Sequence, residues 1–250
     1  MKDGTDIRKR LTDLAMRAER TGSHTFTDFL NINELAVFSA CMNQPGFRGA
    51  VVFGGNEGCE RCMVRFGDFG DESGPEFPIK TIKIAPVQAK FADDLTHRDF
   101  LGAVLGLGIE REKTGDIIIC DNTAYFFVHR DISQFIVDSL EYVRRTHVRA
   151  SFCDEMPEAA KPKLEKRQVI VSSNRIDAII SKLYNLSRDQ SLKLVSEGRV
   201  FINGAQIQSN SKALKEGDTV SVRGFGKWIF RGEGGKTRKD RLYVEVEVYV

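Results

Sequence analysis

Apolar residues recur at helical spacing at the start of the stretch from Asn174 to Gly204. Ile176, Ile179, Ile180 and Leu183 fall at positions i, i+3, i+4 and i+7, which form the buried face of an amphipathic helix. Asn174 carries a short polar side chain that is suited to cap the first turn. The pattern therefore predicts a helix that buries one apolar stripe.

A second short helix is expected directly after the first. Ser187 and Gln190 have the spacing of a capping box, in which each side chain satisfies a backbone N–H of the other's turn. Leu192 and Val195 supply the buried side. Gly198 is suited to the left-handed conformation that ends many helices.

The pattern then changes to that of an antiparallel sheet. Residues 200–202 are apolar, and Asn203-Gly204 is a strong signal for a tight hairpin. A further strand is expected at 219–222, and residues 242–248 alternate between apolar and polar side chains. Two helices thus lead into a sheet.

Between those strands lies a segment that is both aromatic and basic. Residues 223–241 interleave Phe225, Trp228 and Phe230 with seven basic and two acidic residues. Two interpretations stay open for Trp228 and Phe230: the rings cover the sheet, or they stack on bases or ribose.

The first 153 residues show alternating helical and strand patterns without long repeats of strand, helix and strand. We expect an α+β fold with two small plait-like (RRM-like) α/β units before the C-terminal region. Helices are predicted at 6–19, 33–42, 97–107 and 133–143, and strands at 50–53, 61–66, 77–86, 116–120, 124–129 and 148–152.

Composition suggests where the domains divide. Residues 67–78 are rich in Gly, Pro and acids and are expected to form a loop, while 154–168 has two prolines, many charges and no apolar period. The expected domains are therefore 1–74, 75–153 and 169–250, with 154–168 as a linker.

Charge is unevenly distributed along the chain. The formal net charge is only +2, but residues 161–250 hold 18 basic and 10 acidic residues, against 19 and 25 in the remainder. The C-terminal third therefore carries the electrostatic footprint of a polyanion binder.

The basic residues of this third lie outside the apolar stripes. Guanidinium and ammonium groups near helix N-termini are suited to phosphate, although a solvated helix face is the alternative. The order of these features resembles the small RNA-binding domain named after small-subunit ribosomal protein four. That resemblance implies that Arg175, Ser187, Arg188 and Lys193 face RNA, and we add Arg199, Arg223, Lys227 and Trp228 as candidates.

The block from His97 to Asp116, HRDFLGAVLGLGIEREKTGD, is dense in charge. His97, Arg98, Arg111 and Lys113 could form a second anion site, but pairing with Asp94, Asp99, Glu110 and Glu112 is favoured. With the C-terminal domain, the block resembles the YlmH family of bacterial ribosome-associated proteins. The resemblance implies binding to ribosomal RNA and tRNA on the large ribosomal subunit during quality control of stalled chains.

No motif points to catalysis, a cofactor or a metal. The five cysteines are scattered and expected to be free thiols, and Cys59 and Cys62 form a lone CxxC that lacks half the ligands of a zinc site, leaving a redox role open. We expect no catalytic residues, no cofactor and no metal.

These observations favour a non-enzymatic RNA-binding protein. The alternatives are an RNA-modifying enzyme of the ribosomal-RNA methyltransferase or pseudouridine synthase type, and an assembly factor linked to cell division or photosystem II. The chain starts without a secretory leader, and no apolar run reaches the roughly 18–20 residues that span a bilayer. We therefore expect a cytoplasmic protein that binds no membrane and is a monomer when free.

Overall fold

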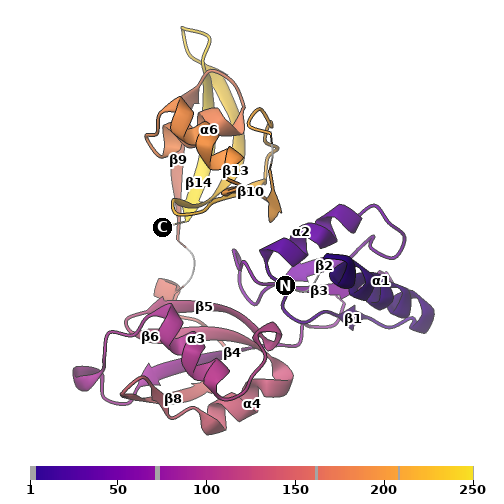
Figure 1. Cartoon of the computed structure of the whole chain (residues 1–250), viewed down its shortest axis with the longest axis vertical. Helices are drawn as coiled ribbons and strands as arrows, with labels where there is room; N and C mark the ends of the chain where they lie inside the picture. The colour runs from indigo at the N-terminus through magenta and orange to yellow at the C-terminus, as the bar shows by residue number, and fades with distance from the viewer. Residues whose placement is uncertain (1–3, 71–73, 161–162, 208, 250) are drawn as a thin grey trace. The chain divides into compact units, whose positions relative to one another are not determined.

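A computed structural model describes residues 4–70, 74–160, 163–207 and 209–249. The chain divides into two compact units, 1–161 and 162–250 (Figure 1). Within the described ranges, none of the helices combines the length and the apolar character that crossing a membrane requires.

The first unit begins with a small three-stranded sheet and two helices. Its elements are α1 (Gly4–Thr21), β1 (Thr25–Phe26), α2 (Ile32–Cys41), β2 (Val51–Phe53) and β3 (Met63–Phe66). The strands are antiparallel in the order β1-β3-β2, and Leu11, Phe38, Phe47 and Phe66 are buried in the core. The expected helices and the strand pair are confirmed, and the described residues of the acidic loop, 67–70 and 74–78, form neither helix nor strand.

The second part of this unit is a plait. Its elements are β4 (Ile79–Pro86), η1 (Ala89–Phe91), α3 (His97–Gly106), η2 (Arg111–Lys113), β5 (Thr114–Cys120), β6 (Thr123–His129), α4 (Arg130–Ser139), β7 (Tyr142–Val143) and β8 (Thr146–Phe152). The antiparallel order β5-β6-β4-β8-β7 is that of a βαββαβ plait with one extra edge strand. Phe100 of α3 and Ile136 of α4 are buried against Ile82 and Phe126 of the sheet.

The expected helix at 133–143 was placed too far along the chain. The α4 helix starts at Arg130, because the His129 ring accepts the N–H of Asp131 as a cap. It ends at Ser139, and Tyr142 and Val143 pair with β8 through a tight turn in which Arg144 has φ 55°.

The other face of the plait sheet receives the N-terminal part of the unit. Phe29 and Met63 form one buried cluster with Phe127 of β6. Gly55 approaches so closely that a Cβ there would lie 2.4 Å from the Phe127 ring, and its φ of +102° also favours glycine. The α+β part before residue 74 is thus packed on the plait.

Arg61 holds these two parts together through backbone carbonyls. Its Nε donates to the Thr114 oxygen at 2.8 Å, and its Nη2 donates to the oxygens of Phe29 and Arg111 at 3.0 Å each. The Asp116 carboxylate in turn accepts the backbone N–H groups of Glu60 and Arg61. Because one guanidinium satisfies three carbonyls from separate segments, it orients the loop against the plait.

The second unit is one six-stranded antiparallel sheet with two helices on one face. Its elements are β9 (Leu164–Val171), α5 (Ile176–Leu183), α6 (Arg188–Ser196), β10 (Val200–Ile202), β11 (Ala205–Gln206), β12 (Thr219–Val222), β13 (Gly226–Lys236) and β14 (Leu242–Tyr249), in the order β11-β10-β12-β13-β14-β9. The expected stripe of α5 is fully in the core, and Asn203 and Gly204 form the predicted hairpin with φ of 49° and 79°.

The expected linker at 154–168 is wrong in its last part. Glu158–Ala160 forms the short helix η3, and residues from Leu164 onward belong to β9, which pairs with β14 along its whole length. This strand lies at the edge of the sheet, so five of its eight side chains are exposed, three of them charged, and its sequence lacks a clear apolar alternation.

Two details of the helices also differ from expectation. Leu192 is only half-buried, and the inward face of α6 is formed by Ser191, Leu194 and Val195. Asn174 does not cap α5: its side chain donates to the Leu214 carbonyl and accepts the Leu214 N–H. Asn174 therefore ties a distant loop to the start of α5, where Arg175 holds the cap position.

The phase of α6 can be tested by truncating its two leucines. We expect Leu194→Ala to lower the free energy of unfolding of the second unit by about 2–4 kcal/mol, because it leaves a cavity in the core. Leu192→Ala should lower the free energy of unfolding by about half as much or less, because Leu192 is only half-buried. Thermal and urea melts of both variants measure this, and equal losses would contradict the assigned inward face.

The role of Arg61 predicts a second stability effect. Arg61→Ala leaves three carbonyls without their donor and should destabilise the first unit by about 2–4 kcal/mol. Arg48→Ala removes an exposed arginine from the same part and should cost no more than about 0.5 kcal/mol. Melting curves that coincide for the two variants would show that Arg61 does not hold the parts together.

Candidate nucleic-acid interface

The junction between α5 and α6 forms a shallow basic groove. It has a volume of about 200 Å³ and is lined by the cationic side chains of Arg175, Lys182 and Arg188 together with the hydroxyl-bearing Ser172, Ser173 and Ser181. Cations combined with hydroxyl donors suit the oxygens of a phosphate. The donors here are Ser172 and Ser173, because the Ser181 hydroxyl donates to the Leu186 carbonyl at 2.7 Å. We define the lining residues named above as the α5–α6 groove.

Arg175 is held in place by a carboxylate. Its Nε and Nη2 donate to the two oxygens of Asp177 at 3.0 and 2.9 Å, and Asp177 is only 3% exposed. This fork of hydrogen bonds raises the pKa of Arg175 above its ordinary value. Because Asp177 offsets the charge of Arg175, and Lys182 and Arg188 form no ion pair with a described residue, the positive charge of the groove comes mainly from these two side chains.

Ser187 and Arg188 open α6. The Ser187 hydroxyl accepts the N–H of Gln190 at 3.2 Å, and the Gln190 side chain accepts the Ser187 N–H at 2.8 Å, which confirms the predicted capping box. The cap fixes the first turn of α6, on which Arg188 is exposed. Arg188 is therefore presented to the groove by a rigid helix start.

Lys193 does not join that groove. It lies five residues after Arg188, which is about 140° around the helix. Its ammonium lies 3.7 Å from Glu197, and its side chain is 74% exposed. Lys193, which the resemblance implies faces RNA, therefore lies outside the lining of the α5–α6 groove.

A second group of cations surrounds the turn between β12 and β13. Arg199 donates to the Arg223 carbonyl at 2.7 Å and lies 5.9 Å above the Phe225 ring. Phe225 is 39% exposed and contacts Tyr184, the residue after α5, with ring centroids 5.2 Å apart. This group offers an accessible aromatic ring beside the Arg199 guanidinium, while the Arg223 guanidinium lies 4.6 Å above the Phe201 ring. An accessible ring beside a cation is the combination that stacks on unpaired bases.

Trp228 is not part of any RNA-facing surface. It is fully buried in the core between sheet and helices, as is Phe230, so covering the sheet is the correct one of the two interpretations. The strand alternation turns Trp228 inward together with Val220, its partner on β12. Lys227, its neighbour, points to the other side and lies 5.3 Å above the Tyr249 ring.

Sequence reasoning missed two residues of these groups. Lys182 was detectable because it lies seven residues after Arg175, two turns along the same helix. Phe225 was noted as part of an aromatic segment, but its position in a turn with glycines on both sides distinguishes it from Trp228 within the strand.

The block from His97 to Asp116 serves the packing of the first unit. Lys113 pairs with Asp28 at 2.7 Å, and Arg111 donates to the carbonyls of Thr114 and Gly115. Burial and the neighbouring Arg111 lower the pKa of His97, so its ring is neutral at neutral pH. The favoured pairing with Asp94, Asp99, Glu110 and Glu112 is wrong in its partners. Lys113 pairs with Asp28 of the N-terminal part, while Asp99 lies 3.7 Å from Arg144 and Glu112 lies 3.5 Å from Arg10.

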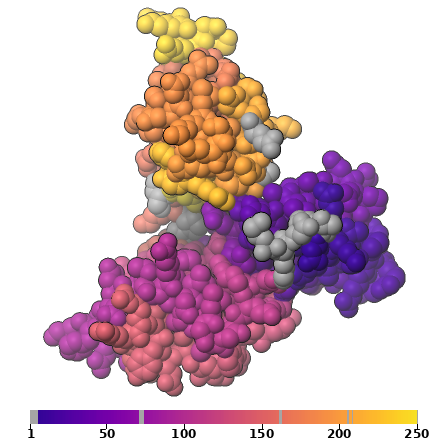
Figure 2. All heavy atoms as spheres, viewed as in Figure 1, coloured from indigo at the N-terminus to yellow at the C-terminus, as the bar shows by residue number. Residues whose placement is uncertain are grey.

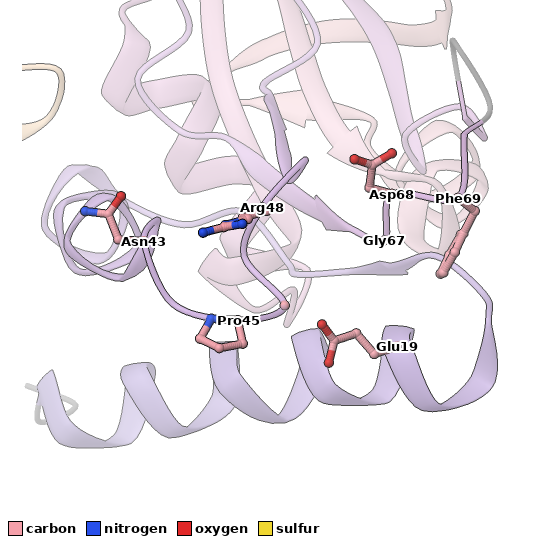
Figure 3. A pocket seen from close by; sticks show the side chains of 8 residues that line it. Glu19, Asn43, Pro45, Arg48, Gly67, Asp68 and Phe69 are labelled. Atoms are coloured by element: carbon pink, nitrogen blue, oxygen red, sulfur yellow. The ribbon is translucent and has the colours of Figure 1, made fainter.

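A hollow in the N-terminal part of the first unit is less suited to an anion. It has a volume of about 470 Å³ and lies between α1 and the loops after α2 and β3 (Figure 3). Its lining includes two carboxylates, Glu19 and Asp68, and one guanidinium, that of Arg48 (Figure 3). Over the described residues, no group of three or more His, Cys, Asp or Glu side chains is placed to hold a metal.

The β13–β14 hairpin adds basic residues at its tip. Figure 2 shows this tip in yellow, standing out from the body of the second unit. Lys236 pairs with Asp240 at 2.7 Å, while Arg238 and Lys239 follow in the exposed turn.

Comparison with known proteins agrees with this arrangement. Residues 73–155 match the family described as a putative RNA-binding domain in YlmH, and residues 174–220 match the S4 domain. The ribosome-associated protein quality control protein P2 of Bacillus subtilis (strain 168) is 30% identical over 227 residues, which are 88% of this chain and 86% of that protein.

A solved structure extends the likeness to the fold. The cell division protein YlmH from Streptococcus pneumoniae superposes with a TM-score of 0.50 at 22% sequence identity, covering 61% of this chain and 92% of that chain. Because the match to the Bacillus subtilis protein spans most of both chains and the two domains occur in the expected order, the chain belongs to the YlmH family.

Proposed function

We propose that this protein binds ribosomal RNA and tRNA on the large ribosomal subunit and acts, without catalysis, in the quality control of stalled chains. The observation that carries the proposal is the α5–α6 groove, in which Lys182 and Arg188 present positive charge beside the hydroxyls of Ser172 and Ser173. The name of the Bacillus subtilis relative supports the ribosomal setting.

Within this proposal the candidate residues have distinct roles. Arg175, Ser187 and Arg188 contact phosphates at the α5–α6 groove, and Arg199, Arg223 and Lys227 contact phosphates around the β12–β13 turn. Lys193 contributes from the outer side of α6. Phe225 takes the stacking role that Trp228 cannot fill, because its ring is accessible.

The proposal extends to the setting of the protein. It acts as a cytoplasmic monomer that joins the ribosome by RNA contacts alone. Sedimentation of the tagged chain through a sucrose gradient of cell lysate tests this: the protein should travel with the large subunit, and a variant with both Lys182→Ala and Arg188→Ala should stay near the top. Equal sedimentation of the two chains would contradict the proposal.

The groove predicts a salt-dependent loss of affinity. Lys182→Ala and Arg188→Ala should each weaken binding of a structured RNA hairpin by about 1 kcal/mol and reduce the log–log salt slope by about one unit, as expected for a lost phosphate contact. Fluorescence anisotropy titrations at several salt concentrations measure both quantities.

Lys166→Ala is the matched control for these titrations. It removes one positive charge from β9, on the sheet face opposite the helices, where its partner in register is Glu247. An equal loss of affinity in the Lys166 variant would mean that the effect is the net charge of the unit and not the groove.

A non-enzymatic role predicts unchanged RNA chemistry. Mass spectrometry of ribosomal RNA and tRNA from cells with and without the protein should show the same set of modified nucleosides. A methyl group or pseudouridine missing from one site, and restored by the wild-type chain, would favour the RNA-modifying alternative.

A further inference from the structure

The plait sheet has one face that neither α3 nor α4 covers. The middle of that face is buried by the N-terminal part of the unit. On that face the central strand β6 carries Tyr125 and Phe127, the positions at which plait RNA-binding domains commonly stack bases. Phe127 is fully buried beneath Phe29 and Met63, and Tyr125 is buried as well. Bases therefore cannot reach the central aromatics of this sheet.

The outer half of the same face is open. In the register between β4 and β8, Lys83 lies opposite Ser151 and Ala85 opposite Arg149, and these side chains alternate with the buried row of Ile82, Ile84, Val148 and Ala150. They line a hollow of about 270 Å³ together with Pro86 and Val87. Ala85 and Ser151 have small side chains, which leaves space between the side chains of Lys83 and Arg149.

An exposed pair of rings continues this surface at the sheet edge. Val87, directly after β4, donates its N–H to the carbonyl of His147 in β8. The exposed surface of β4 therefore continues to His147. Tyr142 of β7 lies opposite His147, and the two rings stack with centroids 5.1 Å apart and an interplanar angle of 28°. Tyr142 is 56% exposed and leaves one face of its ring open.

The charge of this surface is of one sign. None of the residues of β4, β7 and β8 is an aspartate or a glutamate. In the described part of the chain, neither Lys83 nor Arg149 forms an ion pair with a carboxylate. Lys83 and Val87 are about 13 Å apart along the strand, which is enough for a short run of backbone phosphates.

We propose that the outer strip, formed by Lys83, Val87, Tyr142, His147, Arg149 and Ser151, binds a segment of single-stranded RNA. Lys83 and Arg149 contact its phosphates, and a base stacks on the open face of Tyr142. The inference rests on the proposed RNA-binding function but assigns a second contact site, in the first unit. A protein partner is disfavoured because the strip lacks a sizeable apolar centre.

The test uses the full chain and a fluorescein-labelled single-stranded RNA of about 12 nucleotides. To remove the candidate contacts of the second unit, all variants are made in a background with Lys182→Ala, Arg188→Ala and Phe225→Ala. Lys83→Ala with Arg149→Ala should weaken binding about tenfold or more, and Tyr142→Ala about fivefold or more.

Two control variants match these changes. Lys80→Ala removes a lysine of β4 whose side chain lies in the alternate row, opposite Val128, and Phe135→Ala removes an exposed ring from α4. Neither should change affinity by more than about twofold. Ultraviolet crosslinking of the wild-type chain should also place the RNA on a peptide that contains Tyr142 or His147. This measurement does not depend on the folding of any variant.

Three results would overturn the inference: strip variants that bind like their controls, crosslinks confined to the second unit, or no binding of single-stranded RNA in this background. The proposed function is judged separately by binding of the structured hairpin to the α5–α6 groove. Loss of one activity with retention of the other therefore identifies which of the two assignments is wrong.

Discussion

The packing of α5 and α6 on the six-stranded sheet is the constraint on which the candidate RNA interface depends. Burying Ile176, Ile179 and Ile180 against the sheet fixes the rotation of α5, and Leu194 and Val195 do the same for α6. Because the apolar faces point inward, Lys182 and Arg188 must point outward and meet at the helix junction. The capping box at Ser187 then sets where the second helix begins. The basic groove follows from the core and is not an independent feature.

The first unit shows how packing can remove a familiar binding surface. Its plait has the strand order of a common RNA-binding fold, but Phe29, Met63 and Gly55 are packed against the central strand that such folds use for stacking. Arg61 and Asp116 hold this packing through backbone hydrogen bonds. RNA contacts by this unit are therefore confined to surfaces outside the covered centre.

Much of the fold could be predicted because local patterns agreed with long-range packing. The stripe of α5, the Asn-Gly hairpin and the alternation of helices and strands in the plait each show their period within a few residues. Leu192 and Leu194 could not be separated in this way, because apolar residues at 192, 194 and 195 fit two rotations of a short helix. The edge strand β9 was hidden by its charged side chains.

The candidate site was predictable only in part for similar reasons. Arg188 follows a recognisable cap, so its position was clear from the sequence, but Trp228 fits both a core and a stacking role until its strand phase is known. The cover over Phe127 could not be foreseen, because Phe29 and Met63 lie 98 and 64 positions before it and share no local period with it.

The central claim is that the α5–α6 groove holds RNA phosphates. An electron cryomicroscopy map of the protein bound to the large ribosomal subunit tests it most directly. The account predicts RNA density with phosphate oxygens within about 3 Å of the Arg188 guanidinium and the Lys182 ammonium. A map in which the second unit is ordered on the subunit while this groove faces solvent would contradict it.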